Sequence, residues 1–436
     1  MSALENIMLR VSKMEARIGV VGLGYVGLPL LLHFSNAGFK TLGFDTDKKK
    51  IDQIKSGESY ISHILAAEIQ AAARAGMQVT HELSASAECD ALILCLPTPL
   101  TDGMKPDLSY ILDTVDSLLP HLRHGQLISL ESTTYPGTTE EELLPRISKT
   151  GLKIGEEIFL VYSPEREDPA NTDFKFSEIP KLVAGQTLEC LEAGMYLYQS
   201  VVETVVPLSS PRVAELTKLL ENVQRSVNIG LMNEMKLVAD RMNIDIFDVV
   251  EAASTKPFGF STFYPGPGLG GHCIPIDPYY LTYKANLLGI DTRFIELSGE
   301  INRGMPAYVV NKLSLALAER DKELSNSKVL VMGLSYKKNI GDPRESPAMA
   351  ILDLLTQGGA EVSYTDPFFP TFPLMKNYSY SMSSVNLTET AIRSFDSVLL
   401  VTDHDCFDYA FIQLHAQLIV DTRGRYRELS DQIIRA

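Results

Sequence analysis

Residues 16–45 read ARIGVVGLGYVGLPLLLHFSNAGFKTLGFD, and this stretch decides the fold of the first part of the chain. An apolar run typical of a buried strand leads into a turn with three glycines. A stretch with helical spacing follows and ends at Gly38, and a second short strand ends at Asp45. The order of strand, glycine turn, helix, strand and acidic residue predicts a dinucleotide-binding βαβ unit.

Each residue of this fingerprint has an expected role. Gly22 makes the tight turn, Gly24 lets the backbone approach a pyrophosphate, and Gly27 lets the helix pack closely on the strand. The first amide groups of the helix face the phosphates. Asp45 accepts hydrogen bonds from ribose hydroxyls and repels a 2′-phosphate, which favours NAD over NADP, although Lys50 nearby weakens this exclusion slightly. The alternative is a glycine-rich turn that binds nothing.

Three further strand-like runs continue the doubly wound pattern, and each ends in polar residues. The first run leads into a Pro-Thr-Pro loop, the second into residues 131–134 and the third into residues 163–166. Because ligands gather at the carboxyl ends of parallel strands, we expect these polar clusters to face one crevice. Ordinary strand-to-helix turn chemistry is the alternative for any single cluster.

A long helical pattern covers residues 211–242 and is expected to span roughly 50 Å at about 1.5 Å per residue. We expect this helix to bridge domains and to carry a subunit interface. Lys218 and Asn222 are four residues apart, so they share one face of the helix. Such polar pairs are usually solvated surface, but this pair lies beside an apolar stripe.

The strand, turn, helix, strand theme returns after Pro306, which is the expected boundary of a last domain. In this second turn Lys337, Lys338, Asp342 and Arg344 replace the glycine fingerprint. Cations at the start of a helix predict an anionic ligand, and a basic surface turn is the alternative. The predicted fold class is α/β, with two doubly wound, Rossmann-like domains joined by a long central helix. The expected domains are residues 1–208, 209–305 and 306–436.

Residues 263–280 read FYPGPGLGGHCIPIDPYY and are rich in glycine and proline. Glycine supplies backbone conformations that other residues avoid and proline fixes φ, so we expect this loop to hold one conformation. Cys273 ends the glycine run, and Asp277 follows four residues later. The pattern suggests a nucleophilic thiol, with a buried structural cysteine as the alternative.

Composition excludes several classes of protein. Of the 436 residues, 45% are hydrophobic and 22% are charged, as in ordinary globular proteins. A net charge of −16 argues against a nucleic-acid-binding surface. Five scattered cysteines argue for a reducing compartment and against a disulfide framework or a zinc site. Neither a signal peptide nor a membrane span is expected, so a cytoplasmic location is predicted.

Taken together, the motifs resemble those of the UDP-glucose/GDP-mannose dehydrogenase family from about Arg17 to Tyr426. The resemblance rests on GLGYVG, PTP, ESTT with PGTT, SPER, ELTKLLEN, PGPGLGGHCIPIDP and SYKKNIGDPRES. The form of the cysteine loop is similar to that of the branch acting on UDP-N-acetylhexosamines. In the UDP-glucose branch a lysine precedes the aspartate of this motif, whereas Ile276 stands there in this chain.

The resemblance implies an NAD-dependent oxidation of the C6 hydroxyl of UDP-N-acetyl-D-glucosamine to the carboxylate, for O-antigen or capsule biosynthesis. It also implies a C-terminal domain that binds the nucleotide sugar, a homodimer or higher homo-oligomer, and no metal. The alternatives are the same reaction on UDP-N-acetylmannosamine, UDP-glucose or GDP-mannose, and a non-catalytic nucleotide-binding protein.

The resemblance further assigns catalytic roles to single residues. Cys273 would add to the aldehyde, and the resulting thiohemiacetal would be oxidised to a thioester that water hydrolyses. Lys218 and Asn222 would hold the oxyanion. Asp277 would help to position water and Lys218.

Further roles follow from the polar clusters at the strand ends. Thr133 and Glu165 would assist proton transfer through water. The family's second glutamate falls at Pro169, and Glu167 is a candidate to replace it. Besides the glycines and Asp45, the implied cofactor contacts are Tyr25, Val26, Lys50, Thr98, Thr133 and Arg344. The implied nucleotide-sugar contacts are Glu165, Arg166, Lys218, Asn222, Tyr264, Gly268, Tyr336, Lys337 and Arg423.

Overall fold

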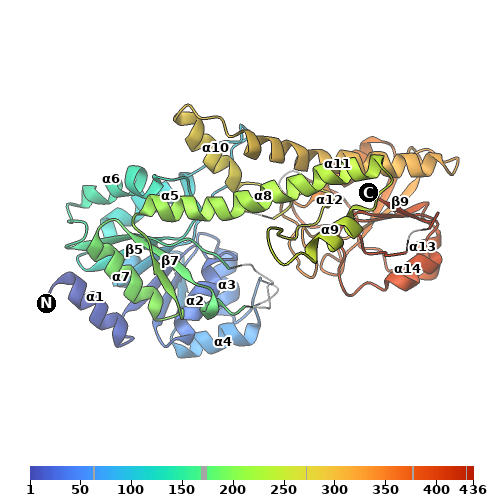
Figure 1. The fold of residues 1–436 in the computed structure, drawn as a ribbon. Coiled ribbons are helices and arrows are strands. Elements are labelled where there is room, and N and C mark those ends of the chain that lie inside the picture. The colour runs from blue at the N-terminus through green and yellow to red at the C-terminus, as the bar shows by residue number, and fades with distance from the viewer. Residues whose placement is uncertain (62–63, 168–173, 272, 376–377, 429) are drawn as a thin grey trace. The chain divides into compact units, whose positions relative to one another are not determined.

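The computed structural model describes residues 1–61, 64–167, 174–271, 273–375, 378–428 and 430–436 (Figure 1). Pro169, one of the positions considered above, lies outside these ranges. The chain divides into two compact units, which are described separately. Unit 1 consists of Met1–Glu221 and Tyr279–Ile290, and unit 2 of Asn222–Pro278 and Asp291–Ala436. Each unit contains an α/β sheet, and the long helix α8 (Pro211–Arg241) joins them, which confirms the predicted fold class.

Unit 1 is built on an eight-stranded sheet with the strand order β3-β2-β1-β4-β5-β6-β7-β8. The strands from β3 to β6 are parallel, whereas β7 runs antiparallel to β6. Strand order reverses between β1 and β4, so the carboxyl ends of these two strands form the point where such sheets bind ligands. The strands are β1 (Arg17–Val21), β2 (Lys40–Phe44), β3 (Gln78–Thr80), β4 (Ala91–Leu94), β5 (Gln126–Leu130), β6 (Ile158–Tyr162), β7 (Lys181–Gly185) and β8 (Val205–Pro207).

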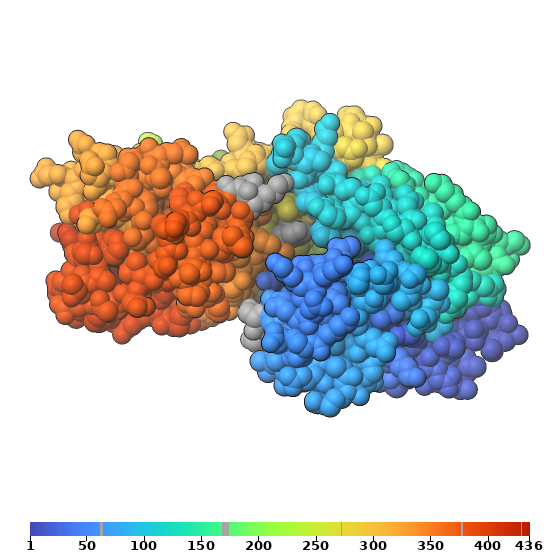
Figure 2. Space-filling view, turned by 180° about the vertical axis from the view of Figure 1, so that it is seen from behind, coloured from blue at the N-terminus to red at the C-terminus, as the bar shows by residue number. Residues whose placement is uncertain are grey.

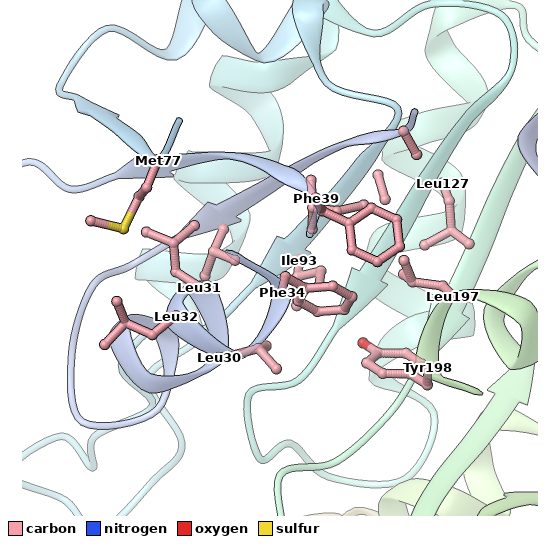
Figure 3. Packing of buried hydrophobic residues seen from close by; sticks show 14 of the residues in the cluster. Leu30, Leu31, Leu32, Phe34, Phe39, Met77, Ile93, Leu127, Leu197 and Tyr198 are labelled. Atoms are coloured by element: carbon pink, nitrogen blue, oxygen red, sulfur yellow. The ribbon is translucent and has the colours of Figure 1, made fainter. Parts of the chain in front are cut away.

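Helices cover both faces of this sheet, as its fully buried strands require. One cluster joins Phe34 and Phe39, whose rings meet edge to face at 5.8 Å, with Leu127, Leu197 and Tyr198 (Figure 3). Burying each large apolar side chain contributes about 1.5–3 kcal/mol, so this cluster anchors the sheet. The helices are α1 (Ala3–Ser12), α2 (Gly27–Asn36), α3 (Lys48–Lys55), α4 (Ala66–Ala75), η1 (Leu83–Glu88), α5 (Ser109–Leu118), η2 (Leu119–His121), η3 (Thr139–Leu143), α6 (Leu144–Ile147), η4 (Ser148–Thr150), η5 (Phe176–Glu178) and α7 (Leu188–Gln199).

Figure 2 shows one face of the surface of unit 1, with most of its residues coloured from blue to green. In α4, Ile69 is buried against the core while Gln70 is exposed. Within the described residues, no helix combines the length and apolar character needed to cross a membrane.

Helix α8 matches the helix predicted over residues 211–242 to within one residue. Its start is tied to the turn after β5, because the buried carboxylate of Glu215 accepts hydrogen bonds from the N–H groups of Gly137 (2.6 Å) and Thr139 (2.9 Å). The predicted apolar stripe is only partly buried. Leu219 is inaccessible, whereas Leu216 and Leu220 are 44% and 60% exposed.

Unit 2 contains a five-stranded parallel sheet with the order β10-β9-β11-β12-β13. Pro306, the predicted domain boundary, lies inside the long helix α11. The strands are β9 (Lys328–Met332), β10 (Glu361–Thr365), β11 (Ser397–Leu400), β12 (Ile419–Asp421) and β13 (Ile433–Arg435). The helices are α9 (Ile246–Ser254), α11 (Arg293–Ala318), α12 (Pro347–Gln357), α13 (Glu389–Arg393) and α14 (Tyr409–His415), and α10 (Asp277–Leu287) begins here.

Candidate active site

The glycine turn after β1 is shaped by close backbone contacts in unit 1. Gly22 has a φ of +91°, and a Cβ there would lie 2.3 Å from the carbonyl oxygen of Cys95. A Cβ on Gly27 would lie 1.8 Å from the carbonyl oxygen of Gly22, whereas no described atom lies within 4 Å of the corresponding position on Gly24. Side chains are therefore excluded where the turn packs on the sheet, and space remains where the backbone would approach a phosphate.

Helix α2 begins directly after this turn without a side-chain cap on its N-terminus. Tyr25 and Val26, which precede the helix, are half-buried. Uncapped N–H groups at a helix start favour an anionic ligand. Asp45 adds the second part of the fingerprint, because its Oδ2 accepts the N–H of Leu23 at 2.9 Å and lies 3.1 Å from Lys50 Nζ. The turn and the carboxylate together fit a dinucleotide.

Other predicted cofactor residues lie at the neighbouring strand ends. Thr98, after β4, is buried, and Thr133, after β5, is half-buried. Ser132 ties these two strand ends together, since its hydroxyl accepts the N–H of Leu96 at 2.8 Å. The polar clusters after β4 and β5 therefore share one edge of the sheet, as the sequence predicted.

Glu165, after β6, is held firmly on both carboxylate oxygens. Its Oε1 accepts the N–H groups of Arg166 (2.7 Å) and Glu167 (2.6 Å), and its Oε2 lies 2.9 Å from Lys181 Nζ. Burial opposes ionisation of this carboxyl group, but the Lys181 ammonium and the backbone donors outweigh it and lower the pKa of Glu165 to about 2. Glu165 is therefore a fixed anion at neutral pH.

Lys181 is the main residue that sequence reasoning missed. Its side chain is only 3% exposed, and its Nζ lies 2.7 Å from Oε2 of Glu131. Burial raises the pKa of Glu131 to about 7, with Lys181 acting in the opposite direction and Glu165 adding to the rise. The run KLVAG predicts a strand from the sequence alone. It does not predict whether this strand runs parallel or antiparallel to its neighbour, so it does not show at which edge of the sheet Lys181 lies.

Arg166 and Lys218 were both predicted to contact the nucleotide sugar. The guanidinium of Arg166 lies 2.7 Å from Oε1 of Glu221 and donates to the carbonyl oxygen of Pro180 at 2.8 Å. It therefore links the loop after β6 to α8. Lys218 is half-buried one turn before Asn222 on the same helix, which agrees with the predicted shared face.

In unit 2, Asn222 and Asp277 form a buried pair. The Asn222 amide donates to Oδ2 of Asp277 at 2.6 Å, and the two residues are 4% and 2% exposed. Cys273 is half-buried, and its carbonyl oxygen accepts the N–H groups of Ile276 (3.1 Å) and Asp277 (2.8 Å). The cysteine thus forms the turn that starts α10, so the segment from Asp277 to Tyr280, expected as loop, is helical.

The glycine-rich loop before Cys273 is tied to the helices of unit 2 by asparagines. The N–H of Gly266 donates to the side chain of Asn233 at 2.9 Å, and Asn233 donates to Asn302 at 2.8 Å. The N–H of Gly271 donates to the carbonyl oxygen of Arg344 at 3.1 Å. These contacts give physical support to the expectation that the loop holds one conformation.

The loop also packs closely on the turn after β9. A Cβ on Gly270 would lie 2.5 Å from Cβ of Tyr336, and a Cβ on Gly271 would lie 2.9 Å from the ring of Tyr336. Gly268 has a φ of +136°, with a Cβ position 3.1 Å from Cβ of Pro347. The glycines are therefore required by the close approach of loop and turn.

The remaining residues of unit 2 that were predicted to contact substrate or cofactor lie around the same loop. Tyr264 is 46% exposed and stacks on Phe247 with 6.3 Å between ring centroids. The guanidinium of Arg423 lies 2.9 Å from the Cβ position of Gly266. Lys337 is half-buried, and Arg344 forms an ion pair of 2.6 Å with Asp342. Unit 2 thus brings together Asn222, Tyr264, Gly268, Cys273, Asp277, Tyr336, Arg344 and Arg423 around one loop.

The turn after β9 keeps more of the dinucleotide geometry than its sequence suggested. Gly333 has a φ of +87°, and the N–H of Leu334 donates to Oδ2 of Asp366 at 2.7 Å, as Leu23 donates to Asp45 in unit 1. The buried ring of His404 lies against this carboxylate, with 3.2 Å between Nε2 and Oδ2 of Asp366. The second turn therefore repeats the backbone geometry of the first, with a buried histidine ring against its carboxylate.

A dinucleotide turn with an acidic residue after the second strand is the cofactor site expected of a nicotinamide-dependent dehydrogenase. The chain matches the UDP-glucose/GDP-mannose dehydrogenase family over its NAD binding domain (residues 16–202), its central domain (212–304) and its UDP binding domain (330–428). The chain belongs to this family and is an NAD-dependent nucleotide-sugar dehydrogenase.

Two of the similar proteins illustrate that relatives of this chain carry different substrate names. A UDP-N-acetyl-D-glucosamine 6-dehydrogenase of Pseudomonas aeruginosa is 35% identical over 90% of this chain and 92% of its own length. A UDP-N-acetyl-D-mannosamine dehydrogenase of Methanococcus maripaludis is 34% identical over 90% and 87%. The structure of the UDP-D-ManNAc dehydrogenase from Pyrococcus horikoshii aligns with a TM-score of 0.86 at 29% identity, covering 96% of this chain and 98% of that one.

Proposed function

We propose that this dehydrogenase oxidises the C6 hydroxyl of UDP-N-acetyl-D-glucosamine to the carboxylate, for O-antigen or capsule polysaccharide biosynthesis. The observation that carries the proposal is the ordered loop that presents Cys273 at the start of α10 beside the buried Asn222–Asp277 pair. Ile276 in the loop motif supports a UDP-N-acetylhexosamine over UDP-glucose, and the Pseudomonas relative supports the glucosamine epimer. UDP-N-acetyl-D-mannosamine is the second candidate, favoured by the relatives that carry its name.

The bound NAD supplies the acceptor for the hydride that leaves C6 in each of the two oxidations. After the first oxidation the sulfur of Cys273 adds to the C6 aldehyde, which makes a tetrahedral carbon that can lose a second hydride. The product is a thioester, and water cleaves its C–S bond, which releases the carboxylate and restores the thiol. Cysteine suits this sequence because sulfur both attacks the aldehyde and leaves from the thioester.

Asn222 has the geometry to assist the covalent step. A primary amide carries two N–H donors, and one of them is bonded to Asp277. The Asp277 carboxylate thereby fixes the orientation of the amide. The second N–H would then donate to an oxyanion on the carbon attached to Cys273. Lys218, one turn earlier on α8, would supply the matching positive charge. Removal of one such donor costs roughly 3 kcal/mol of transition-state stabilisation in known enzymes.

The other assignments remain part of the proposal. Thr133 and Glu165 handle water and protons, and the glycine turn with Asp45 holds NAD. The nucleotide sugar is contacted by Glu165, Arg166, Lys218, Asn222, Tyr264, Gly268, Tyr336, Lys337 and Arg423. The cofactor is contacted further by Tyr25, Val26, Lys50, Thr98, Thr133 and Arg344. The three-domain division at residues 208 and 305 and a cytoplasmic location are proposed on the same basis.

A homo-oligomer is proposed from the apolar surface of the long helix. Leu216 and Leu220 are 44% and 60% exposed in the single chain, as are Met235 and Val238 (39% and 43%) farther along α8. Exposed apolar side chains repeated along one helix are typical of a subunit interface. A mass measurement in solution tests this assembly.

The substrate proposal is tested by NADH formation with UDP-N-acetyl-D-glucosamine, UDP-N-acetyl-D-mannosamine, UDP-glucose and GDP-mannose. The expected result is the highest kcat/KM with UDP-N-acetyl-D-glucosamine and two NADH per sugar. A higher kcat/KM with the mannosamine epimer would move the assignment to the second candidate. One NADH per sugar with accumulating aldehyde would overturn the covalent mechanism.

A further inference from the structure

The direction of β7 explains why Lys181 lies at the edge of the sheet that carries the cofactor turn. Strand β7 is antiparallel to β6, with Tyr162 opposite Ala184. Because partners in an antiparallel pair step in opposite directions, the same register continued past Tyr162 sets Glu165 opposite Lys181. The first residue of β7 therefore reaches the carboxylates that follow the parallel strands β5 and β6.

Behind Lys181 the network continues into the core. Oε2 of Glu131 lies 2.7 Å from the ammonium, and its Oε1 accepts the hydroxyl of Tyr198 at 2.7 Å. The Tyr198 hydroxyl lies 2.7 Å from that of Ser129 on β5, and Figure 3 shows Tyr198 within the buried cluster. The side chain of Glu131 is fully inaccessible, whereas that of Glu165 is 12% exposed. The network thus runs from the core outward and ends at Glu165.

We propose that Lys181 is a positioning residue for the dehydrogenase reaction: it keeps Glu165 ionised and in a fixed orientation at the end of β6, while Glu131 holds Lys181 from behind. This inference rests on the role in water handling proposed above for Glu165. With two backbone N–H groups on Oε1 and the ammonium on Oε2, the carboxylate cannot rotate. Glu165 therefore accepts hydrogen bonds from water in one defined direction and does not itself keep a proton.

The ammonium is the only positive charge that the described contacts place on both carboxylates. Without this charge, burial acts on Glu165 with no cation to oppose it, and burial favours the protonated form of a carboxyl group. Three other titratable groups act on the network: Tyr198 from α7, Cys95 after β4 and His33 from α2. Burial keeps Cys95 and Tyr198 protonated and lowers the pKa of His33, so none of the three replaces the ammonium.

The test measures kcat and KM for NADH formation between about pH 5 and pH 9 in full-length variants. Lys181→Met removes the charge, Lys181→Gln removes it but keeps hydrogen-bond donors, and Lys181→Arg keeps it. The double variant Lys181→Met/Glu131→Gln removes the second carboxylate as well. Lys284→Met is the matched control, because Lys284 also forms a 2.7 Å ion pair in unit 1, with Glu141, and is 14% exposed.

The expected result is a new loss of kcat at low pH in the Met and Gln variants, roughly tenfold at pH 6, where the pKa of Glu165 has risen. KM for NAD stays within about threefold, and Lys181→Arg and the Lys284 control keep the wild-type profile. The new loss persists in the double variant, which assigns it to Glu165 and not to Glu131.

Two results would overturn the inference. The first is a kcat at low pH that equals the wild-type value in Lys181→Met or Lys181→Gln, whichever of them folds. The second is a double variant, Lys181→Met/Glu131→Gln, that no longer shows the loss of kcat at low pH. If the wild-type enzyme itself forms no NADH with any of the four nucleotide sugars, the proposed function fails before any variant is compared. The two failures are therefore distinguishable.

Discussion

The amide of Asn222 and the carboxylate of Asp277 are joined by a buried hydrogen bond of 2.6 Å between α8 and the first residue of α10. Asn222→Ala leaves the carboxylate without this donor and removes the proposed oxyanion contact. We expect kcat to fall by about 10²–10³, with a smaller effect on KM. A buried acceptor without a partner also costs about 1–3 kcal/mol of stability. Steady-state kinetics and thermal unfolding measure the two effects, and an unchanged kcat would contradict the oxyanion role.

Cys273→Ser should separate the two oxidations. The serine hydroxyl is a far weaker nucleophile than a thiolate, so we expect the second oxidation to be lost or a covalent intermediate to be trapped. NADH stoichiometry and the intact mass of the protein after reaction report these outcomes. Cys406→Ser is the control, because Cys406 is another cysteine of unit 2 that is exposed and lies outside the loop. Wild-type turnover in Cys273→Ser would refute the nucleophile assignment.

Cofactor choice should depend on the carboxylate of Asp45. Asp45→Asn removes the charge that repels a 2′-phosphate and weakens the hydrogen bond from Leu23. We expect kcat/KM for NAD to fall about tenfold and the ratio of NADP to NAD turnover to rise. Asp52→Asn, on the exposed side of α3, is the control. Better use of NADP than NAD by the wild-type enzyme would show that Asp45 does not select the cofactor.

Gly271→Ala tests the close packing of the cysteine loop on Tyr336. Gly271 has a φ of +89°, and its added Cβ would meet the ring at 2.9 Å. We expect KM for the UDP-sugar to rise about tenfold. Backbone strain at this position should also lower the free energy of unfolding by roughly 1–3 kcal/mol. Gly289→Ala separates the two causes, because its φ is +73° and no described atom lies within 4 Å of its Cβ position. Equal effects on KM in both variants would rule out the contact with Tyr336.

The stability of unit 1 should depend on the ionisation of Glu131. Its folded pKa of about 7 lies above the ordinary value of 4.5, so folding favours the protonated form. The stabilisation that the protonated Glu131 gives to the folded state is then fully present below about pH 4.5 and is lost as pH rises through 7. The glutamine in Glu131→Gln cannot ionise. The difference in melting temperature, variant minus wild type, should therefore be larger at pH 8 than at pH 5. A difference that does not change with pH would contradict this linkage.

The parts of the structure that depend on local pattern could be predicted from the sequence. The glycine turn, Asp45 and the long helix from Pro211 follow from residues that are close together in the chain. The cysteine loop was recognised from its glycines and prolines, although its end from Asp277 is helical. The domain boundary predicted at Pro306 stays a prediction, and this proline lies within α11.

What could not be predicted depends on strand direction and long-range pairing. Lys181 is one polar residue before an apolar run, and nothing local indicates that its strand runs against its neighbour. Its partner Glu131 lies 50 residues away in sequence. The contact between His404 and Asp366 likewise spans 38 residues and requires the order of the strands in the second sheet.

The pair formed by His404 and Asp366 has a consequence for how one chain keeps two nucleotide ligands apart. Both sheets build the same bend and aim the same carboxylate at it. In the second sheet the buried ring of His404 lies beside that carboxylate, whereas in the first sheet the lysine Lys50 lies there. A flexible cation therefore stands beside the bend in one sheet and a rigid ring beside the bend in the other, so a nucleotide would meet different surroundings in the two halves of the chain.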